Sequence, residues 1–186
     1  MDKRIEKTKI ALHTAFYCLR AERAIRDIKV IDLCKAAKVN KTTFYAHYKN
    51  IFELSEEVER ELIRRIITSI PRNMNNSFEN IATYTVEVTL AFERYIHELT
   101  VLFNGTELPR LGVYLEQVMK ASIFESYPHL KDNGEVNFLL SYCIHGAFDA
   151  SMSNPDVPLE TRLETLKTIT QTIQPLLKER DGHSSV

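Results

Sequence analysis

The 186-residue sequence has little of what several protein classes require. Its three scattered cysteines, Cys18, Cys34 and Cys143, form no CxxC pair, which excludes a disulfide framework and a cysteine zinc site and favours a reducing compartment. Five glycines and six prolines leave little room for a many-turned β fold. No apolar run approaches the roughly 18 residues that span a bilayer, and no secretory signal opens the chain. These shortages predict a cytoplasmic all-α protein without a membrane segment.

The charge is unevenly distributed, although the net charge is only −1. Residues 1–52 contain 12 Lys and Arg against 5 Asp and Glu, a net of +7, whereas residues 53–186 contain 12 against 20, a net of −8. A basic block joined to an acidic body indicates one end that meets an anion such as DNA. A solvated basic face without a partner is the alternative, and charge alone does not decide between them.

Apolar residues recur at helical spacing along nearly the whole chain. The spacing predicts helices over residues 3–23, 30–37, 41–48, 50–70, 81–102, 107–127 and 135–153, and a last helix from residue 158. Asn50 and Glu53 are spaced as a capping box, and Pro71 follows the helix that they begin. The turn-rich stretch 72–77 is the one candidate boundary, which predicts domains over residues 1–70 and 71–186.

The segment 30–49 carries the most information about function. Its two short helices are joined by three residues, the arrangement of a helix-turn-helix. Cys34 is small enough for a close helix crossing, Val39 is the apolar residue of the turn, and Phe44 is expected to face inward. The other face of the second helix is polar and basic, so its side chains would reach phosphates and base edges in a major groove. Tyr48 is expected in the core.

A distinctive motif within about residues 5–62 is formed by Leu33, Ala37, Val39, Asn40, Lys41, Thr43, Phe44, Tyr45, His47, Tyr48 and Leu54. This motif resembles the N-terminal domain of the tetracycline-repressor (TetR) family of bacterial transcription regulators. The resemblance implies a helix-turn-helix domain over residues 1–70, a helical ligand-binding and dimerisation domain over residues 71–186, and a double-stranded DNA operator as partner. The DNA contacts that it implies come from Lys29, Lys41, Thr42, Thr43, Tyr45, His47 and Lys49.

Three residues depart from the family pattern. Lys38 stands at the turn position that is usually glycine, so a residue with a Cβ atom is expected at a positive φ, at a cost of about 1 kcal/mol. Ile51 stands where a phosphate-binding lysine is common, and Ala46 is small where many members carry a larger contacting side chain. These departures predict that the protein binds DNA but does not follow the operator preferences common to the family.

The C-terminal part predicts self-association. Residues 135–153 combine a broad apolar side with small residues such as Gly146 and Ala147, and the last helix is strongly amphipathic. This combination predicts an intermolecular four-helix bundle about a two-fold axis, the homodimer that the resemblance also implies. An intrachain core is the alternative.

The TetR resemblance also implies an effector pocket among the middle helices. A pocket needs apolar walls with a few polar groups. The candidate lining residues are Phe92, Tyr95, Phe103, Tyr114, Tyr127 and His145. Aromatic residues at helical spacing would equally well form a core.

No motif predicts catalysis, a metal site or a cofactor. The sequence has no glycine-rich phosphate loop, no GxSxG and no HExxH. Cys143 and His145 would point about 200° apart on a helix, and His145 with Asp149 gives too few ligands for a structural metal.

The predicted function is therefore a DNA-binding transcription regulator, in the first place a repressor released by a small-molecule effector. Two alternatives stay open. One is a DNA-binding protein of the same fold whose body docks a protein partner. The other is a helical small-molecule-binding or catalytic protein whose basic N-terminus is incidental.

Overall fold

A computed structural model describes residues 3–71, 80–104 and 108–181 of the chain. Over these ranges every regular element is a helix, and no strand occurs. The all-α class predicted from the sequence is therefore confirmed. Within the same ranges, no helix combines the length and the apolar character that crossing a bilayer needs.

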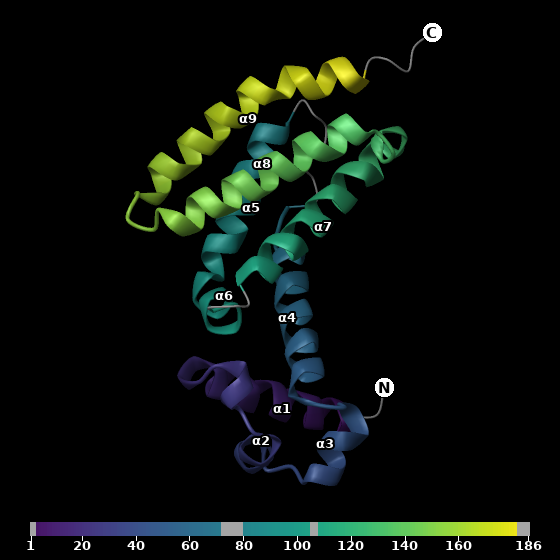
Figure 1. Ribbon diagram of the computed structural model, residues 1–186, viewed down its shortest axis with the longest axis vertical. Helices are drawn as coiled ribbons and strands as arrows, with labels where there is room; N and C mark the ends of the chain where they lie inside the picture. Colours follow the sequence, from purple (N-terminus) through teal and green to yellow (C-terminus); the bar gives the residue numbers. More distant parts are fainter. Residues whose placement is uncertain (1–2, 72–79, 105–107, 182–186) are drawn as a thin grey trace. The chain divides into compact units, whose positions relative to one another are not determined.

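Figure 1 labels the helices along the chain. In chain order they are α1 (Lys3–Glu22), the 3-10 turn η1 (Ile25–Asp27), α2 (Val30–Ala37), α3 (Lys41–His47), α4 (Ile51–Thr68), α5 (Ile81–Arg94), α6 (Ile96–Leu102), α7 (Leu108–Ser126), the 3-10 turn η3 (Pro128–Leu130), α8 (Gly134–Ser153) and α9 (Leu159–Asp181). The predicted helix limits agree with these to within two residues, except over residues 81–102. The predicted boundary at 72–77 lies outside the described residues.

The prediction of one continuous helix over residues 81–102 is wrong. The helix stops at Arg94, and Tyr95, with φ −111° and ψ 17°, separates α5 from α6. The reason is tertiary packing, because α5 packs along α9 whereas α6 packs on α1. A single apolar stripe at helical spacing thus supplies two helices with different partners.

The chain folds as two compact units. The first unit contains Met1–Arg65 and Tyr95–Glu107, and the second unit contains Ile66–Arg94 and Leu108–Val186. Each unit is therefore built from separated stretches of sequence. The sequence pattern did not indicate that residues 95–107 return to the first unit.

In the first unit, α1 is the central helix, because α2 and α6 both pack on it. Leu12 and Phe16 on α1 are fully buried, together with Leu33 on α2 and Phe44 on α3. These side chains form the apolar core that fixes the rotation of the two short helices.

A buried arginine joins the ends of two helices in the first unit. The guanidinium of Arg20 donates hydrogen bonds to the carbonyl of Leu102 at 2.8 Å and to the side-chain oxygen of Asn104 at 3.0 Å. It also donates to the carbonyl of Arg23 at 3.0 Å. The last carbonyls of a helix lack partners within the helix, and Arg20 supplies a donor at the end of α6.

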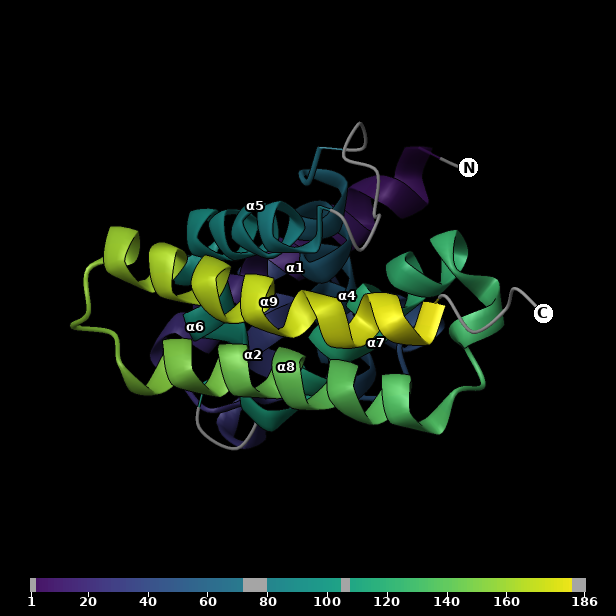
Figure 2. The same cartoon turned by 90° about the horizontal axis from the view of Figure 1, so that it is seen from above.

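In the second unit, α5 lies along α9 and α7 packs on α8. The helices α8 and α9 run side by side in both views (Figures 1 and 2). Asn133 begins α8, because its side-chain oxygen accepts the N–H of Val136 at 3.1 Å. Val136, Leu140 and Ile144 form the buried side of this helix. The opposite side of α8 is left for solvent or for a partner.

Candidate nucleic-acid interface

A three-residue turn joins α2 to α3. Lys38 has φ 54° and ψ 41°, so the positive φ predicted for this position is confirmed. The N–H of Val39 donates to the carbonyl of Cys34 at 2.9 Å, and the side-chain oxygen of Asn40 accepts the N–H of Thr43 at 2.7 Å. The turn thus closes one helix and caps the next.

The inner face of this helix pair is apolar. Phe44 is fully buried, and Tyr48 and Cys34 are nearly so, while Val39 is half-buried. The rings of Phe44 and Tyr48 lie 5.7 Å apart. The inward orientation predicted for Phe44 and the core position predicted for Tyr48 are confirmed. Burial of this face determines which residues of α3 point outward.

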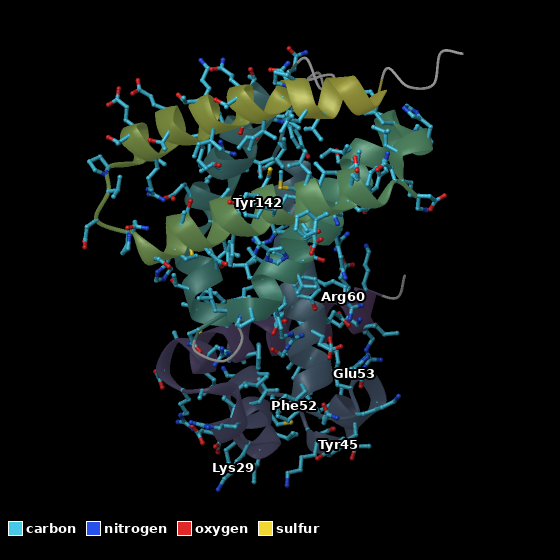
Figure 3. The ribbon with its side chains drawn as sticks, turned by 45° about the horizontal axis from the view of Figure 1, so that its top comes forward. Lys29, Tyr45, Phe52, Glu53, Arg60 and Tyr142 are labelled. Carbon is cyan, nitrogen blue, oxygen red and sulfur yellow. The ribbon has the colours of Figure 1, made fainter. Side chains whose placement is uncertain are left out.

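The outer face is polar and carries positive charge. Tyr45 exposes 57% of its surface, and Figure 3 shows it with Lys29 on the first unit. Five of the seven predicted DNA contacts are exposed, namely Lys29, Lys41, Thr42, Tyr45 and Lys49. The other two, Thr43 and His47, are half-buried. None of the seven lies in the core, and three are lysines that can attract phosphate.

Two N–H groups in the first turn of α4 already have a hydrogen-bond acceptor within the protein. The side-chain oxygen of Asn50 accepts from the N–H groups of Phe52 at 2.9 Å and Glu53 at 3.0 Å, which confirms the predicted cap. The carboxylate of Glu53 accepts the N–H of Lys49 at 2.6 Å, one residue before the position that a capping box uses. Ile51 is buried. A phosphate beside this helix end would therefore be bound by side chains, such as the ammonium of Lys49.

A polar network behind α3 was not predicted. Glu57 on α4 accepts hydrogen bonds from the ammonium of Lys9 at 2.8 Å and from the phenol of Tyr48 at 3.2 Å. His13 Nε2 lies 3.1 Å from the Tyr48 oxygen and 3.4 Å from the Glu57 carboxylate. The network joins α1, the end of α3 and α4. Its one trace in the sequence is the i, i+4 spacing of Lys9 and His13, which places them on one face of α1.

Burial and neighbouring charges set the protonation of this network. Burial lowers the pKa of His13 and outweighs the opposing effect of Glu57. Burial also raises the pKa of Tyr48, and the charge of Glu57 adds to this. Burial alone would raise the pKa of Glu57, but the bond and charge of Lys9, with His13 and Tyr48, hold it below its ordinary value. At neutral pH the network therefore contains a carboxylate, a neutral phenol and a neutral imidazole.

The predicted pocket residues are divided between the two units. Tyr95 and Phe103 belong to the first unit, in which Phe103 is buried. The second unit holds the other four, all half-buried, which are Phe92, Tyr114, Tyr127 and His145. Neither unit by itself contains all six.

An open groove of about 460 Å³ lies on the second unit at α8 and α9. Its lining residues are Gly134, Glu135, Phe138, Leu139 and Leu176. Phe138 exposes 76% of its surface and Tyr142, one turn further along α8, exposes 69%. Figure 3 shows Tyr142 on this helix. The groove thus belongs to an exposed apolar face that includes no predicted pocket residue.

His145 takes part in hydrogen bonding between α7 and α8. Its Nε2 lies 2.9 Å from one carboxylate oxygen of Glu116, while Lys120 at 2.8 Å and Ser141 at 2.5 Å bind the other oxygen. The bond from Lys120, with those from Ser141 and His145, lowers the pKa of Glu116 to about 2. A Cβ atom at Gly112 would come within 3.3 Å of the His145 ring, so a larger residue at position 112 would press on this network.

The polar clusters do not form a metal site. Nowhere in the described ranges do three His, Cys, Asp or Glu side chains come together as a metal ion needs.

Comparison of the sequence with models of known protein families gives no match, and comparison with curated proteins gives none either.

Proposed function

We propose that the protein is a sequence-specific DNA-binding transcription regulator of the TetR type, which acts as a homodimer in the cytoplasm. The observation that carries the proposal is the outer face of α3, which is polar and basic while its inner face is locked in the core. A short helix held in this way can enter a major groove and present its side chains to base edges.

The residues of this face divide into two roles. Tyr45 and Thr42 are exposed near the middle and start of α3, where side chains reach bases. Lys41 and Lys49 supply charge for the phosphates, which fixes the register of the helix on the duplex. The acidic remainder of the chain, with a net of −8 over residues 53–186, disfavours DNA contact elsewhere.

Two such helices are needed to read a two-fold operator, whose half-sites lie about 34–36 Å apart. The exposed apolar face of α8 and α9 supports the pairing of two copies, because Phe138, Tyr142 and Leu176 would be removed from water in a four-helix bundle. A repressor of this design is released when an effector favours a different spacing of the two heads. A thermal-shift panel of metabolites tests whether a small molecule or a protein partner supplies that input.

The first experiment is binding of the full-length protein to a fluorescent duplex from its own upstream region, titrated against salt. We expect saturable binding at dimer stoichiometry and a steep negative slope of log K against log salt. Lys41→Ala is expected to reduce that slope by about 1, and Tyr45→Ala to weaken binding by about 1–3 kcal/mol while leaving the slope nearly unchanged.

Lys131→Ala serves as the control, because it removes the same charge from an exposed position of the second unit. It should leave both the affinity and the slope as in the wild type. Equal binding of all three variants to any duplex would mean that general charge alone is at work, and the regulator proposal would fail.

A further inference from the structure

The phenol of Tyr48 connects the end of α3 to two other helices. Tyr48 directly follows α3, and its N–H still donates to the carbonyl of Phe44 at 2.9 Å. Its ring is buried, but its oxygen meets Glu57 of α4 and His13 of α1. The last turn of the helix is therefore held both by its backbone and by a side-chain bond.

The direction of the hydrogen bonds follows from the available protons. Tyr48 has one hydroxyl proton and donates it to Glu57, so its oxygen accepts the bond from Nε2 of His13. Lys9 donates to the same Glu57 oxygen and its ammonium lies 5.8 Å from the centre of the Tyr48 ring. Two donors, Lys9 on α1 and Tyr48 at the end of α3, thus converge on one oxygen of the Glu57 carboxylate, and His13 holds the Tyr48 hydroxyl, which fixes the geometry of the network.

The negative charge of Glu57 is unfavourable in a unit that binds DNA. A carboxylate weakens the attraction between the basic first unit and phosphate, so on charge alone its removal would tighten DNA binding. A positioning role makes the opposite prediction, because losing the acceptor frees the end of α3 and spoils the placement of its outer face. Whether DNA binding becomes tighter or weaker when Glu57 is neutralised therefore distinguishes an effect of charge alone from a positioning role.

We propose that Glu57 is a positioning residue for DNA binding, which sets the placement of α3 against α1 and α4 through the Tyr48 phenol without touching DNA. This inference rests on the proposed function. It adds a residue outside the reading face to those on which operator affinity depends.

The test compares Glu57→Gln with Glu56→Gln in the full-length protein. Glu56 is the neighbouring carboxylate on α4, half exposed and paired only loosely with Arg60 at 3.7 Å, so its substitution removes the same charge without reaching Tyr48. Binding to the duplex of the wild-type experiment is measured by fluorescence anisotropy under conditions in which circular dichroism shows every variant folded. Glu57→Gln is expected to weaken binding about tenfold, whereas Glu56→Gln leaves it unchanged or slightly tighter.

Tyr48→Phe gives the second half of a double-mutant cycle, because it removes only the hydroxyl. It is expected to weaken binding by several-fold, and the double variant with Glu57→Gln is expected to lose little more than Glu57→Gln alone. The salt slope should stay as in the wild type, since no phosphate contact is removed. Hydrogen exchange of the α3 amides in the free protein should accelerate in both single variants but not in Glu56→Gln.

Three results would overturn the inference. Glu57→Gln could bind as tightly as Glu56→Gln, the losses of the two single variants could add in full, or α3 exchange could be unchanged. Each of these leaves the proposed function intact as long as the wild type binds and Lys41→Ala lowers the slope. Absence of wild-type binding to DNA would instead overturn the proposed function and this inference with it.

Discussion

The two compact units expose opposite kinds of surface. On α3 of the first unit, polar and positively charged residues point outward from a locked apolar inner face. On α8 of the second unit, the outward residues include the aromatic rings of Phe138 and Tyr142. A cationic face attracts phosphate, whereas contiguous exposed apolar side chains are typical of a protein interface. In the proposed function, this difference assigns DNA contact to the first unit and self-association to the second.

The half-buried polar networks of the two units, by contrast, use the same chemistry. In each, one glutamate accepts hydrogen bonds from a lysine and a hydroxyl and lies beside a histidine, and in each the pKa of the glutamate is lowered. Glu57 joins three structural segments and involves the end of α3, whereas Glu116 joins only α7 and α8. The role of such a network therefore depends on which helix ends it contacts. The residue types in the network do not by themselves reveal that role.

The largest expected effect breaks the apolar surface of the second unit. Phe138→Asp combined with Tyr142→Asp places carboxylates where the proposed bundle has aromatic rings, and the dissociation constant of the dimer should rise by about 100-fold or more. Sedimentation equilibrium measures this change. Ile10→Asp is the control, since Ile10 on α1 exposes 60% of its surface in the first unit and should leave the dimer intact. A double variant that sediments as the wild-type dimer would contradict the comparison.

A smaller effect tests the interior of the first unit. Arg20→Ala leaves the Leu102 carbonyl and the Asn104 side chain without this donor and opens a cavity at the end of α1, so the free energy of unfolding should fall by about 2 kcal/mol. Urea unfolding followed by circular dichroism measures it. Arg23→Ala, which removes an exposed arginine paired with Asp32 at 3.4 Å, should cost no more than about 0.5 kcal/mol. Equal losses would show that the buried bonds contribute nothing.

The smallest expected effect is on the pH dependence of the free energy of unfolding, and it tests the Glu116 network. Because the native pKa of Glu116 is lowered to about 2, its ionised form stabilises the fold above the ordinary value near 4.5, and this contribution is lost as the pH falls toward 2. Glu116→Gln should lower the free energy of unfolding by about 1 kcal/mol at pH 6 and flatten its decline in acid.

Urea titrations at a series of pH values measure this dependence, with Glu125→Gln as the control because Glu125 is an exposed carboxylate of the same helix. An acid limb in Glu116→Gln as steep as in the wild type would mean that other carboxylates carry the acid sensitivity.

Much of the local structure could be predicted from the sequence. The start of α4 at Asn50, the positive φ of Lys38 and the inward position of Phe44 all follow from interactions within a few residues. Helical periodicity divides α3 into an inner and an outer face, so the sequence predicts which residues of this helix point outward. The complete set of predicted DNA contacts, which includes Lys29 and Lys49 outside α3, came from the resemblance to the TetR family.

The sequence by itself therefore determined the helices, their caps and the polar face of α3, because each of these depends on neighbours along the chain. The tertiary structure alone decided the break at Tyr95, the bond from Arg20 to Leu102 and the two glutamate networks. The partners in these contacts are 82 residues apart for Arg20 and Leu102, 48 for Lys9 and Glu57, and 29 for His145 and Glu116. Helical spacing holds no information on which distant residue will meet which, since packing of the apolar faces brings them together only in the folded chain.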